Sequence, residues 1–262
     1  MKRYLIFAYG LVCYAAFFAT FLYAIGFVGN LFVPKGIDSA PQLPMAHAAL
    51  INLGLLGIFA LQHSVMARPF FKSWITRYIP ASAERSTFVL FASLALIALF
   101  HFWQPMGVVI WDIEGAVGRI VMLTGFVFGW SLVLVTTFLI NHFDLFGLRQ
   151  VWLQLRNKPY TPVDFVLPLP YRMIRHPLYF GFLCAFWFTP TMTVAHLVFA
   201  AVTTAYILVA IRFEEHDLQQ AHPEYREYRK QVPMIVPAFP RPAHSDRPAQ
   251  TGTTIAGSTS LR

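Results

Sequence analysis

Two groups of polar residues enclose the last long apolar segment of this chain. The segment is opened by Arg175-His176-Pro177-Leu178-Tyr179-Phe180-Gly181 and closed by Arg212-Phe213-Glu214-Glu215. A proline after two cationic residues suits the first position of a helix, because its missing N–H is not needed there. The free N–H groups of that first turn, with Arg175 beside them, form a favourable seat for a carboxylate. The sequence therefore predicts an anion-binding site where this segment begins.

A second polar group spans residues 141–150, where another apolar run ends, and contains His142, Asp144 and Arg149. Ionisable groups at a helix end are costly beside lipid unless they face a cavity or pair with one another. Two interpretations follow. In the first, Asn141 ends the helix, Asp144 pairs with Arg149 and His142 reaches water. In the second, His142 is a general base that Asp144 orients.

A third polar group, Gln62-His63-Ser64 followed by Met66-Ala67-Arg68, ends an earlier apolar run. A lone histidine at a membrane interface is more often structural than catalytic. All three groups are nevertheless expected on one membrane face, and this convergence favours a shared site.

The composition places these groups in a membrane protein. Charged residues make up 12% of the chain and hydrophobic residues 57%, with 26 phenylalanines, whereas soluble domains carry about 25% charged residues. The first apolar run, about residues 4–32, is too long for a signal peptide and is interpreted as a retained span. Further apolar runs cover about residues 46–66, 87–102, 117–140 and 179–211.

The last run is predicted to form a hairpin. As one straight helix its thirty-odd residues would extend well beyond a hydrocarbon core of about 30 Å, at about 1.5 Å per residue. Thr189-Pro190-Thr191-Met192-Thr193 supplies a break in the middle. A short first limb and a longer second limb are therefore expected.

The distribution of charge gives the orientation. Basic residues gather in the loop after the second run and in the loop before the hairpin, while acidic residues occupy the opposite loops. By the positive-inside rule the N terminus, the two basic loops and the C terminus share the cytoplasmic side. We expect an all-α integral membrane protein with four transmembrane helices and a C-terminal helical hairpin, which gives five to six spans.

Residues 1–240 are expected to form one domain. It contains N-terminal spans over 4–140, a cytoplasmic loop over 141–178, and the hairpin with its following segment over 179–240. Residues 241–262, which are rich in small polar residues, are predicted to be disordered. The net charge of +8 is explained by membrane orientation and contact with anionic lipid, without a nucleic-acid partner. Cys13 and Cys184 lie in apolar runs and indicate neither a metal site nor a disulfide.

The order of these motifs resembles the isoprenylcysteine carboxyl methyltransferase superfamily of integral-membrane enzymes. The resemblance rests on residues 175–181, on Glu214-Glu215, and on the ending from Tyr225 and Tyr228 to Val232-Pro233. The first half of the chain, with residues 62–68 and 141–150, resembles the NnrU/nurim-like branch, and within it the bacterial methanethiol S-methyltransferases. The match covers about residues 1–240.

The resemblance implies S-adenosylmethionine as cofactor, held by the hairpin and the segment after it. Arg175 and the amides after Pro177 would hold the cofactor carboxylate, His176 and Tyr179 would line the adenosine pocket, and one of the two glutamates would accept hydrogen bonds from the ribose or the ammonium group. The expected cofactor-binding residues are Arg175, His176, Pro177, Leu178, Tyr179, Gly181, Glu214, Glu215 and Tyr225. Two structural alternatives stay open: Arg175 pairs with Glu215 across the hairpin, and Tyr179 belongs to the aromatic belt. No G-x-G-x-x-G motif follows a strand, so a Rossmann-type methyltransferase domain is unsupported.

The implied reaction is methyl transfer to a small thiol, with methanethiol converted to dimethyl sulfide. A thiol reacts as its thiolate and needs a base; we expect His142, oriented by Asp144, and in second place His63. The expected substrate pocket consists of Phe138, Asn141, Phe143, Phe146 and Gln62, without a metal. Two alternatives remain, namely a methyltransferase for a prenyl-cysteine or other lipid-like acceptor, and a non-enzymatic NnrU/nurim-like protein. The expected location is the inner membrane of a bacterium.

Overall fold

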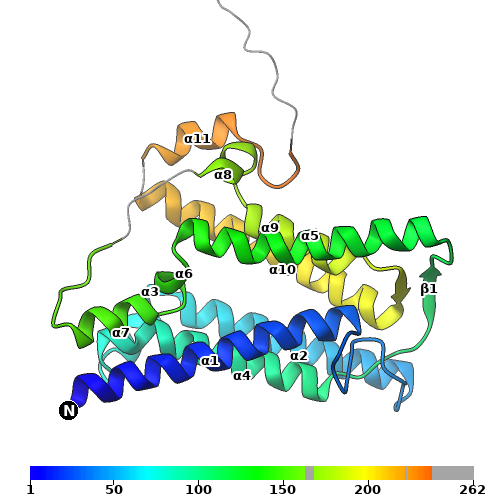
Figure 1. The fold of residues 1–262 in the computed structure, drawn as a ribbon, viewed down its shortest axis with the longest axis horizontal. Coiled ribbons are helices and arrows are strands. Elements are labelled where there is room, and N and C mark those ends of the chain that lie inside the picture. Colours follow the sequence, from blue (N-terminus) through cyan, green and yellow to red (C-terminus); the bar gives the residue numbers. More distant parts are fainter. Residues whose placement is uncertain (163–167, 222, 238–262) are drawn as a thin grey trace, which may run out of the picture.

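Five long apolar helices form the body of the protein. The computed structural model describes residues 1–162, 168–221 and 223–237, so the predicted disordered tail, residues 241–262, lies outside the described residues. The long helices run roughly along the long axis of the molecule (Figure 1). They are α1 (Lys2–Gly29), α2 (Met45–Ala67), α4 (Glu84–Phe102), α5 (Ala116–Ile140) and α10 (Val194–Ala221).

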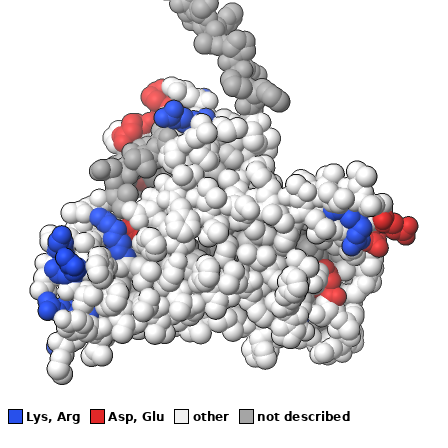
Figure 2. Space-filling model, in the orientation of Figure 1, with Lys and Arg blue, Asp and Glu red and all other residues white. Residues whose placement is uncertain are grey.

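The predicted apolar runs coincide with these helices, with small differences at their ends. The first helix stops at Gly29 rather than near residue 32, because Asn30 takes a left-handed conformation with φ of 53°, which asparagine tolerates well at a helix end. Only 17–33% of the residues in the most apolar part of each helix are buried within the protein. The remaining apolar residues of these helices lie on the outside of the protein, where lipid must surround them. Figure 2 shows charged side chains at the ends of the molecule and over α11 (Tyr225–Gln231), with a broad uncharged belt between them.

The predicted hairpin is confirmed. Its first limb is the short helix α9 (Pro177–Trp187) and its second limb is α10, and the break between them contains β2 (Thr191–Thr193). With 11 residues, α9 is about 16 Å long and reaches only halfway through a hydrocarbon core.

A small sheet connects the hairpin to the rest of the protein and was absent from the all-α prediction. Strand β1 (Val109–Asp112) pairs antiparallel with β2, with Val109 opposite Thr193 and Asp112 opposite Thr191. It lies at the end of the molecule away from the N terminus (Figure 1). The β-branched and aromatic run Val108-Val109-Ile110-Trp111 carried a strand signal, which the surrounding helices obscured.

Short helices cover the opposite end, where the sequence suggested loops. They are α3 (Pro69–Ile75), the 3₁₀ turn η1 (Ala81–Ala83), α6 (His142–Leu145) and α7 (Leu148–Leu155). Another short helix, α8 (Leu169–Met173), lies beside α11 (Figure 1). Helix α7 packs closely on α1, since a Cβ atom on Gly10 would lie 2.6 Å from Val151 Cγ2. The predicted cytoplasmic loop is therefore a helical layer on this end of the bundle.

Glycines bring α5 and α9 into direct backbone contact. A Cβ atom on Gly129 would lie 2.7 Å from the carbonyl oxygen of Gly181, and one on Gly181 would lie 2.9 Å from that of Gly129. Farther along, Gly125 meets Phe188, so the two helices are antiparallel. The end of α5 therefore lies near the start of α9.

Candidate active site

The two polar groups of the hairpin meet, as predicted. Arg175 Nε donates to Glu215 Oε1 at 2.7 Å, and the two side chains are 9% and 4% exposed. The cross-hairpin ion pair that the sequence left open is therefore present. Since both groups are buried and already paired, neither is a freely available contact for a ligand.

Arg175 also fastens the segment after α10 to the start of α9. Its Nη1 donates to the carbonyls of Arg229, at 2.9 Å, and Val232, at 2.5 Å. Arg229 Nε in turn lies 3.1 Å from Glu215 Oε2. The backbone N–H groups of residues 175 and 176 donate to the carbonyls of residues 233 and 234. One cation thus holds α9, α10 and the end of α11 together.

The two glutamates have different surroundings. Glu215 accepts a second contact from His176 Nε2 at 3.2 Å, deep in the protein. Glu214 accepts from the Tyr179 hydroxyl at 2.9 Å and its side chain is 45% exposed. The ring of Tyr179 lies 5.6 Å from that of His176. Of the two carboxylates, Glu214 is the one with an oxygen open to a ligand.

Unpaired polar groups gather around the first turn of α9. Pro177 occupies its first turn, as predicted, and no side chain caps the helix, so its first amides remain available. Tyr225 is 2% exposed, and its hydroxyl has no partner in the part of the chain that the structure describes. Burial raises the pKa of this hydroxyl, so it stays protonated. A buried hydroxyl without a partner is costly, and these groups fit a polar ligand that carries a carboxylate.

One predicted cofactor residue has a different place. The Cα of Gly181 faces α5, where a Cβ atom would meet the Gly129 carbonyl and the backbone N of Val133. Its absent side chain therefore serves the close approach of two helices, which is a common use of glycine inside membranes.

His142 lies inside the protein, and the predicted contact with Asp144 is wrong. His142 is 3% exposed. Its Nδ1 lies 2.8 Å from Thr137 Oγ1 and its Nε2 lies 2.8 Å from the Tyr14 hydroxyl. Thr137 lies one turn earlier, at the end of α5, whereas the Asp144 carboxylate accepts from Arg149. Burial lowers the pKa of His142.

Asp144 belongs to the cap that the first interpretation described. It accepts from Arg149 at 2.8 Å, and from the Tyr160 hydroxyl at 3.3 Å, while its backbone N–H donates to the Asn141 side chain at 3.2 Å. Asn141 itself has φ of 146° and ψ of 86°, a conformation that costs about 1–3 kcal/mol outside glycine and is concentrated at functional sites.

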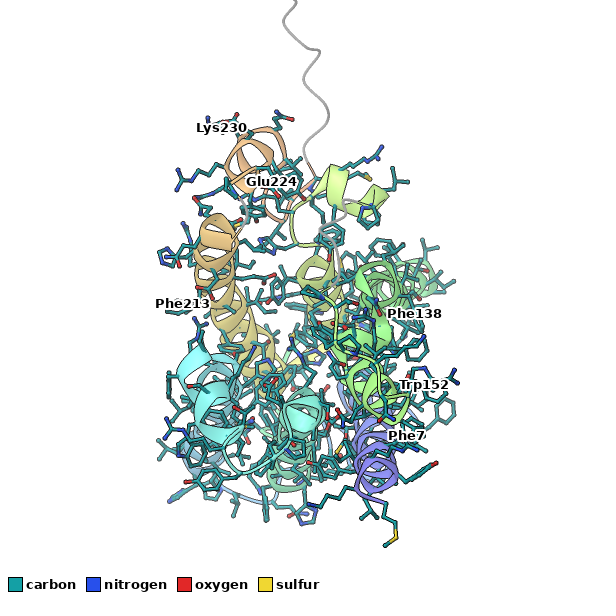
Figure 3. The ribbon with its side chains drawn as sticks, turned by 90° about the vertical axis from the view of Figure 1, so that its left-hand side faces the viewer. Phe7, Phe138, Trp152, Phe213, Glu224 and Lys230 are labelled. Atoms are coloured by element: carbon teal, nitrogen blue, oxygen red, sulfur yellow. The ribbon has the colours of Figure 1, made fainter. Side chains whose placement is uncertain are left out.

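Aromatic rings enclose His142. Phe138 stacks on it with ring centres 4.1 Å apart, Phe146 lies at 4.8 Å and Phe143 at 5.5 Å. Beside them is a crevice of about 370 Å³ between α1, α6 and α7. Figure 3 shows Phe138, Trp152 and Phe7 along this side of the molecule. The crevice is lined by Phe7, Leu11, Asn141, Phe143, Leu148, Arg149 and Trp152.

The third polar group is not brought into contact with the second. His63 packs against Phe59 and Phe88, with ring centres 5.4 and 4.9 Å away, whereas His142 lies between α1 and α5. The neighbouring Ser64 joins α2 to α10 through the Tyr206 hydroxyl at 3.1 Å. Among the described atoms, His63 Nδ1 and Gln62 Oε1 are buried without partners. Gln62 is not among the residues that line the crevice.

The sequence reasoning missed Tyr14, Thr137 and Arg229. Tyr14 lies 128 residues from its partner His142. A tyrosine inside an apolar span needs a hydrogen-bond partner for its hydroxyl, which was the one available signal. Thr137 and Arg229 had no distinguishing context.

Comparison with known proteins gives close relatives along nearly the whole chain. It is 57% identical to a methanethiol S-methyltransferase of Crocosphaera subtropica, over 90% of this chain and 93% of that protein. It is 53% identical to a methanethiol S-methyltransferase of Mycobacterium tuberculosis, over 90% and 98%. Bovine nurim is 29% identical over 64% of this chain and 67% of its own length. No protein-family model and no solved structure matches the chain.

Proposed function

Because the chain belongs to the methanethiol S-methyltransferase family, we propose that it methylates methanethiol with S-adenosylmethionine and releases dimethyl sulfide. The observation that carries this proposal is the 57% identity over 90% of the chain. That match spans 238 residues, whereas the match to bovine nurim spans 177. The relation to nurim is far weaker, so we favour an enzyme over a non-enzymatic membrane protein.

The first turn of α9 is the proposed cofactor site. When bound, S-adenosylmethionine supplies a methyl group on a positively charged sulfur. The amides of Leu178 and Tyr179 would hold its carboxylate, and the open oxygen of Glu214 would accept from its ammonium group or ribose. The hydroxyl of Tyr225 would gain the partner that it lacks. Arg175, His176 and Glu215 would act mainly by holding these elements in place.

His142 is the proposed base for the thiol, with His63 in second place. A buried imidazole that stays neutral near pH 7 has a lone pair to offer. Thr137 replaces Asp144 as the residue that orients the ring. The rings of Phe138, Phe143 and Phe146 would give a small apolar thiol its surroundings, next to Asn141 at the edge of the crevice.

We further propose that the end of the molecule with α3 and α7 faces the cytoplasm of a bacterial cell, together with both termini. Basic residues of the loops gather at this end, whereas the β1–β2 sheet lies at the other (Figures 1 and 2). This orientation follows the positive-inside rule and gives the α9 site access to a cytosolic cofactor.

The test is a direct assay of the purified protein in detergent. Methyl-labelled S-adenosylmethionine is supplied with methanethiol, a longer alkyl thiol, a prenyl-cysteine, or no acceptor, and labelled product is identified by mass. We expect labelled dimethyl sulfide. Labelled prenyl-cysteine ester without labelled thioether would replace the proposed acceptor, and no labelled product with any acceptor would refute an enzymatic role. An Arg226→Ala variant, changed at an exposed position of α11, serves as the matched control for site variants.

A further inference from the structure

We propose that Tyr14 is a catalytic residue: its hydroxyl takes the proton of the thiol and passes its own proton to His142. This inference rests on the proposed function, since it concerns how the thiol becomes a nucleophile. It is carried by a chain of three hydrogen bonds that runs from α1 to α5.

The direction of this chain follows from its last member. Thr137 Oγ1 lies 2.7 Å from the carbonyl of Leu134, and a carbonyl only accepts, so the single hydroxyl proton of Thr137 is used there. Thr137 must then accept from His142 Nδ1, at 2.8 Å. In a neutral imidazole the other nitrogen carries the lone pair. His142 Nε2 therefore accepts from the Tyr14 hydroxyl at 2.8 Å.

Access to the basic nitrogen leads through Tyr14. His142 is 3% exposed, and its face is covered by Phe138, whose ring is inclined by only 4°. Both of its nitrogens are occupied, so an incoming thiol finds no free position on the ring. The Tyr14 side chain is only partly buried, and its oxygen has lone-pair capacity left after it donates to His142.

The crevice lies along the face of α1 that carries Tyr14. Phe7, Leu11 and Tyr14 are spaced by four and three residues, so they lie on one face of α1. Phe7 and Leu11 line the crevice, as does Phe143, whose ring centre is 6.5 Å from that of Tyr14. An apolar thiol dissolved in the membrane can follow this face to Tyr14. The antiparallel contact of α5 with α9 brings the end of α5, next to His142, near the start of α9, where the proposed cofactor site lies.

The proton transfer is balanced within these groups. The S–H bond breaks as a new O–H bond forms on Tyr14, while the original O–H bond of Tyr14 breaks and an N–H bond forms on His142 Nε2. His142 becomes an imidazolium, with Thr137 and Tyr14 as acceptors. The stacked ring of Phe138, 4.1 Å away, favours this charge, and the nearby charges of Asp144 and Arg149 are paired with each other. After the product leaves, Tyr14 gives its proton to water in the crevice and takes the proton back from His142 Nε2, so the imidazole is neutral again.

A Tyr14→Phe variant tests the proposal, with Tyr23→Phe as the matched control. Tyr23 lies on the same helix, and its hydroxyl donates to the Lys35 carbonyl, at the other end of α1. We expect Tyr14→Phe to lower the turnover of methanethiol about 10²-fold or more, as for a lost acid–base group. The defect should shrink with a more acidic thiol and at higher pH, where the thiol arrives ionised. Tyr23→Phe should show neither effect.

A second measurement needs no methyl donor. Methanethiol labelled with ¹³C is added to the protein, and the ¹⁵N resonances of His142 are followed. In the wild type we expect the Nε2 signal to shift when the thiol binds, because the Tyr14 hydroxyl that donates to Nε2 then also accepts from the thiol, and in Tyr14→Phe we expect no such shift. An unchanged Nε2 response in Tyr14→Phe, or turnover defects equal for all thiols and at every pH, would overturn the relay.

Failure of the proposed function gives a different result from failure of the relay, because in that case the wild type itself methylates no thiol. If Tyr14→Phe does not fold, 3,5-difluorotyrosine at position 14 keeps the hydroxyl but makes it more acidic. The relay then predicts a displaced pH–rate profile. An unchanged profile would refute it.

Discussion

The Arg175 ion pair allows a prediction in which both location and magnitude follow from the structure. In Arg175→Ala the side chain loses its contact with Glu215 at 2.7 Å and its contacts with the carbonyls of Arg229 and Val232. Breaking a buried ion pair by removing one partner typically costs about 3–5 kcal/mol. Glu215 keeps His176 and Arg229 as neighbours, so we expect the lower end of this range.

The loss should be local. Two of the three broken contacts go to the end of α11 and the residue after it, and none of the three goes to α1, α2 or α4. A loss of about 3 kcal/mol, confined to this segment, corresponds to roughly 100-fold faster opening of its hydrogen bonds, at about 1.4 kcal/mol per factor of ten. From sequence alone, Arg175→Ala and Glu215→Ala are expected to weaken cofactor binding and leave folding intact. The structure predicts that binding and local order fall together.

Hydrogen–deuterium exchange in detergent measures this effect. Exchange of residues 225–235 should accelerate about 100-fold in Arg175→Ala, while α5 keeps its protection, and the stabilisation of the protein by S-adenosylmethionine should decrease. Glu214→Gln is the matched control, because Glu214 makes one hydrogen bond from a half-exposed position; it should leave exchange unchanged. Equal protection of residues 225–235 in wild type and Arg175→Ala would show that the ion pair does not hold the segment.

Three further predictions follow from other parts of the molecule. Burial lowers the pKa of His142 below its ordinary value of about 6.5, so its neutral form stabilises the fold above about pH 6.5 and this contribution is lost as the pH falls. The unfolding temperature should therefore drop more between pH 7.5 and 5.5 in the wild type than in His142→Gln. An equal drop in both proteins would contradict this prediction. Gly129→Ala should destabilise the protein by about 1–3 kcal/mol through overpacking against α9, whereas Gly54→Ala, with nothing within 4 Å, should be close to neutral in the same thermal-unfolding assay. A single cysteine that replaces Lys72 or Lys158 should react with a membrane-impermeant thiol reagent from the cytoplasmic side, and one that replaces Pro190 should react from the opposite side. The background should be low because Cys13 and Cys184 are buried. Labelling of positions 72 and 158 from opposite sides would refute the orientation.

The sequence predicted the helices well because their apolar runs are long and their breaks are marked. Thr189-Pro190-Thr191 separates α9 from α10, and Asn30 and Asn141 end their helices, since proline, asparagine and hydroxyl residues act locally. The meeting of Arg175 with Glu215 was also foreseeable, because the two ends of a hairpin must lie side by side.

Contacts between helices that are far apart in the sequence could not be predicted from the sequence alone. Asp144 was chosen as the partner of His142 because it is two residues away, yet both ring nitrogens turn to other helices, to Thr137 and to Tyr14. Gly181 was predicted to bind the cofactor because it ends the polar motif of residues 175–181, but in the structure it allows α9 to pack closely on α5. Strand β1 pairs with a segment about eighty residues later, and local propensity does not reveal such a partner.

The short length of α9 has a consequence for how the protein is made. With 11 residues it is too short to partition into a bilayer as an independent span. During synthesis it must insert together with α10, against an α5 that is already in the membrane and offers the flat surface at Gly129. The end of the hairpin that carries the proposed cofactor site is therefore completed last, after the spans around His142 are in place. A chain truncated before α10 would keep its first four spans and lack the glutamates of the proposed methyl-donor site.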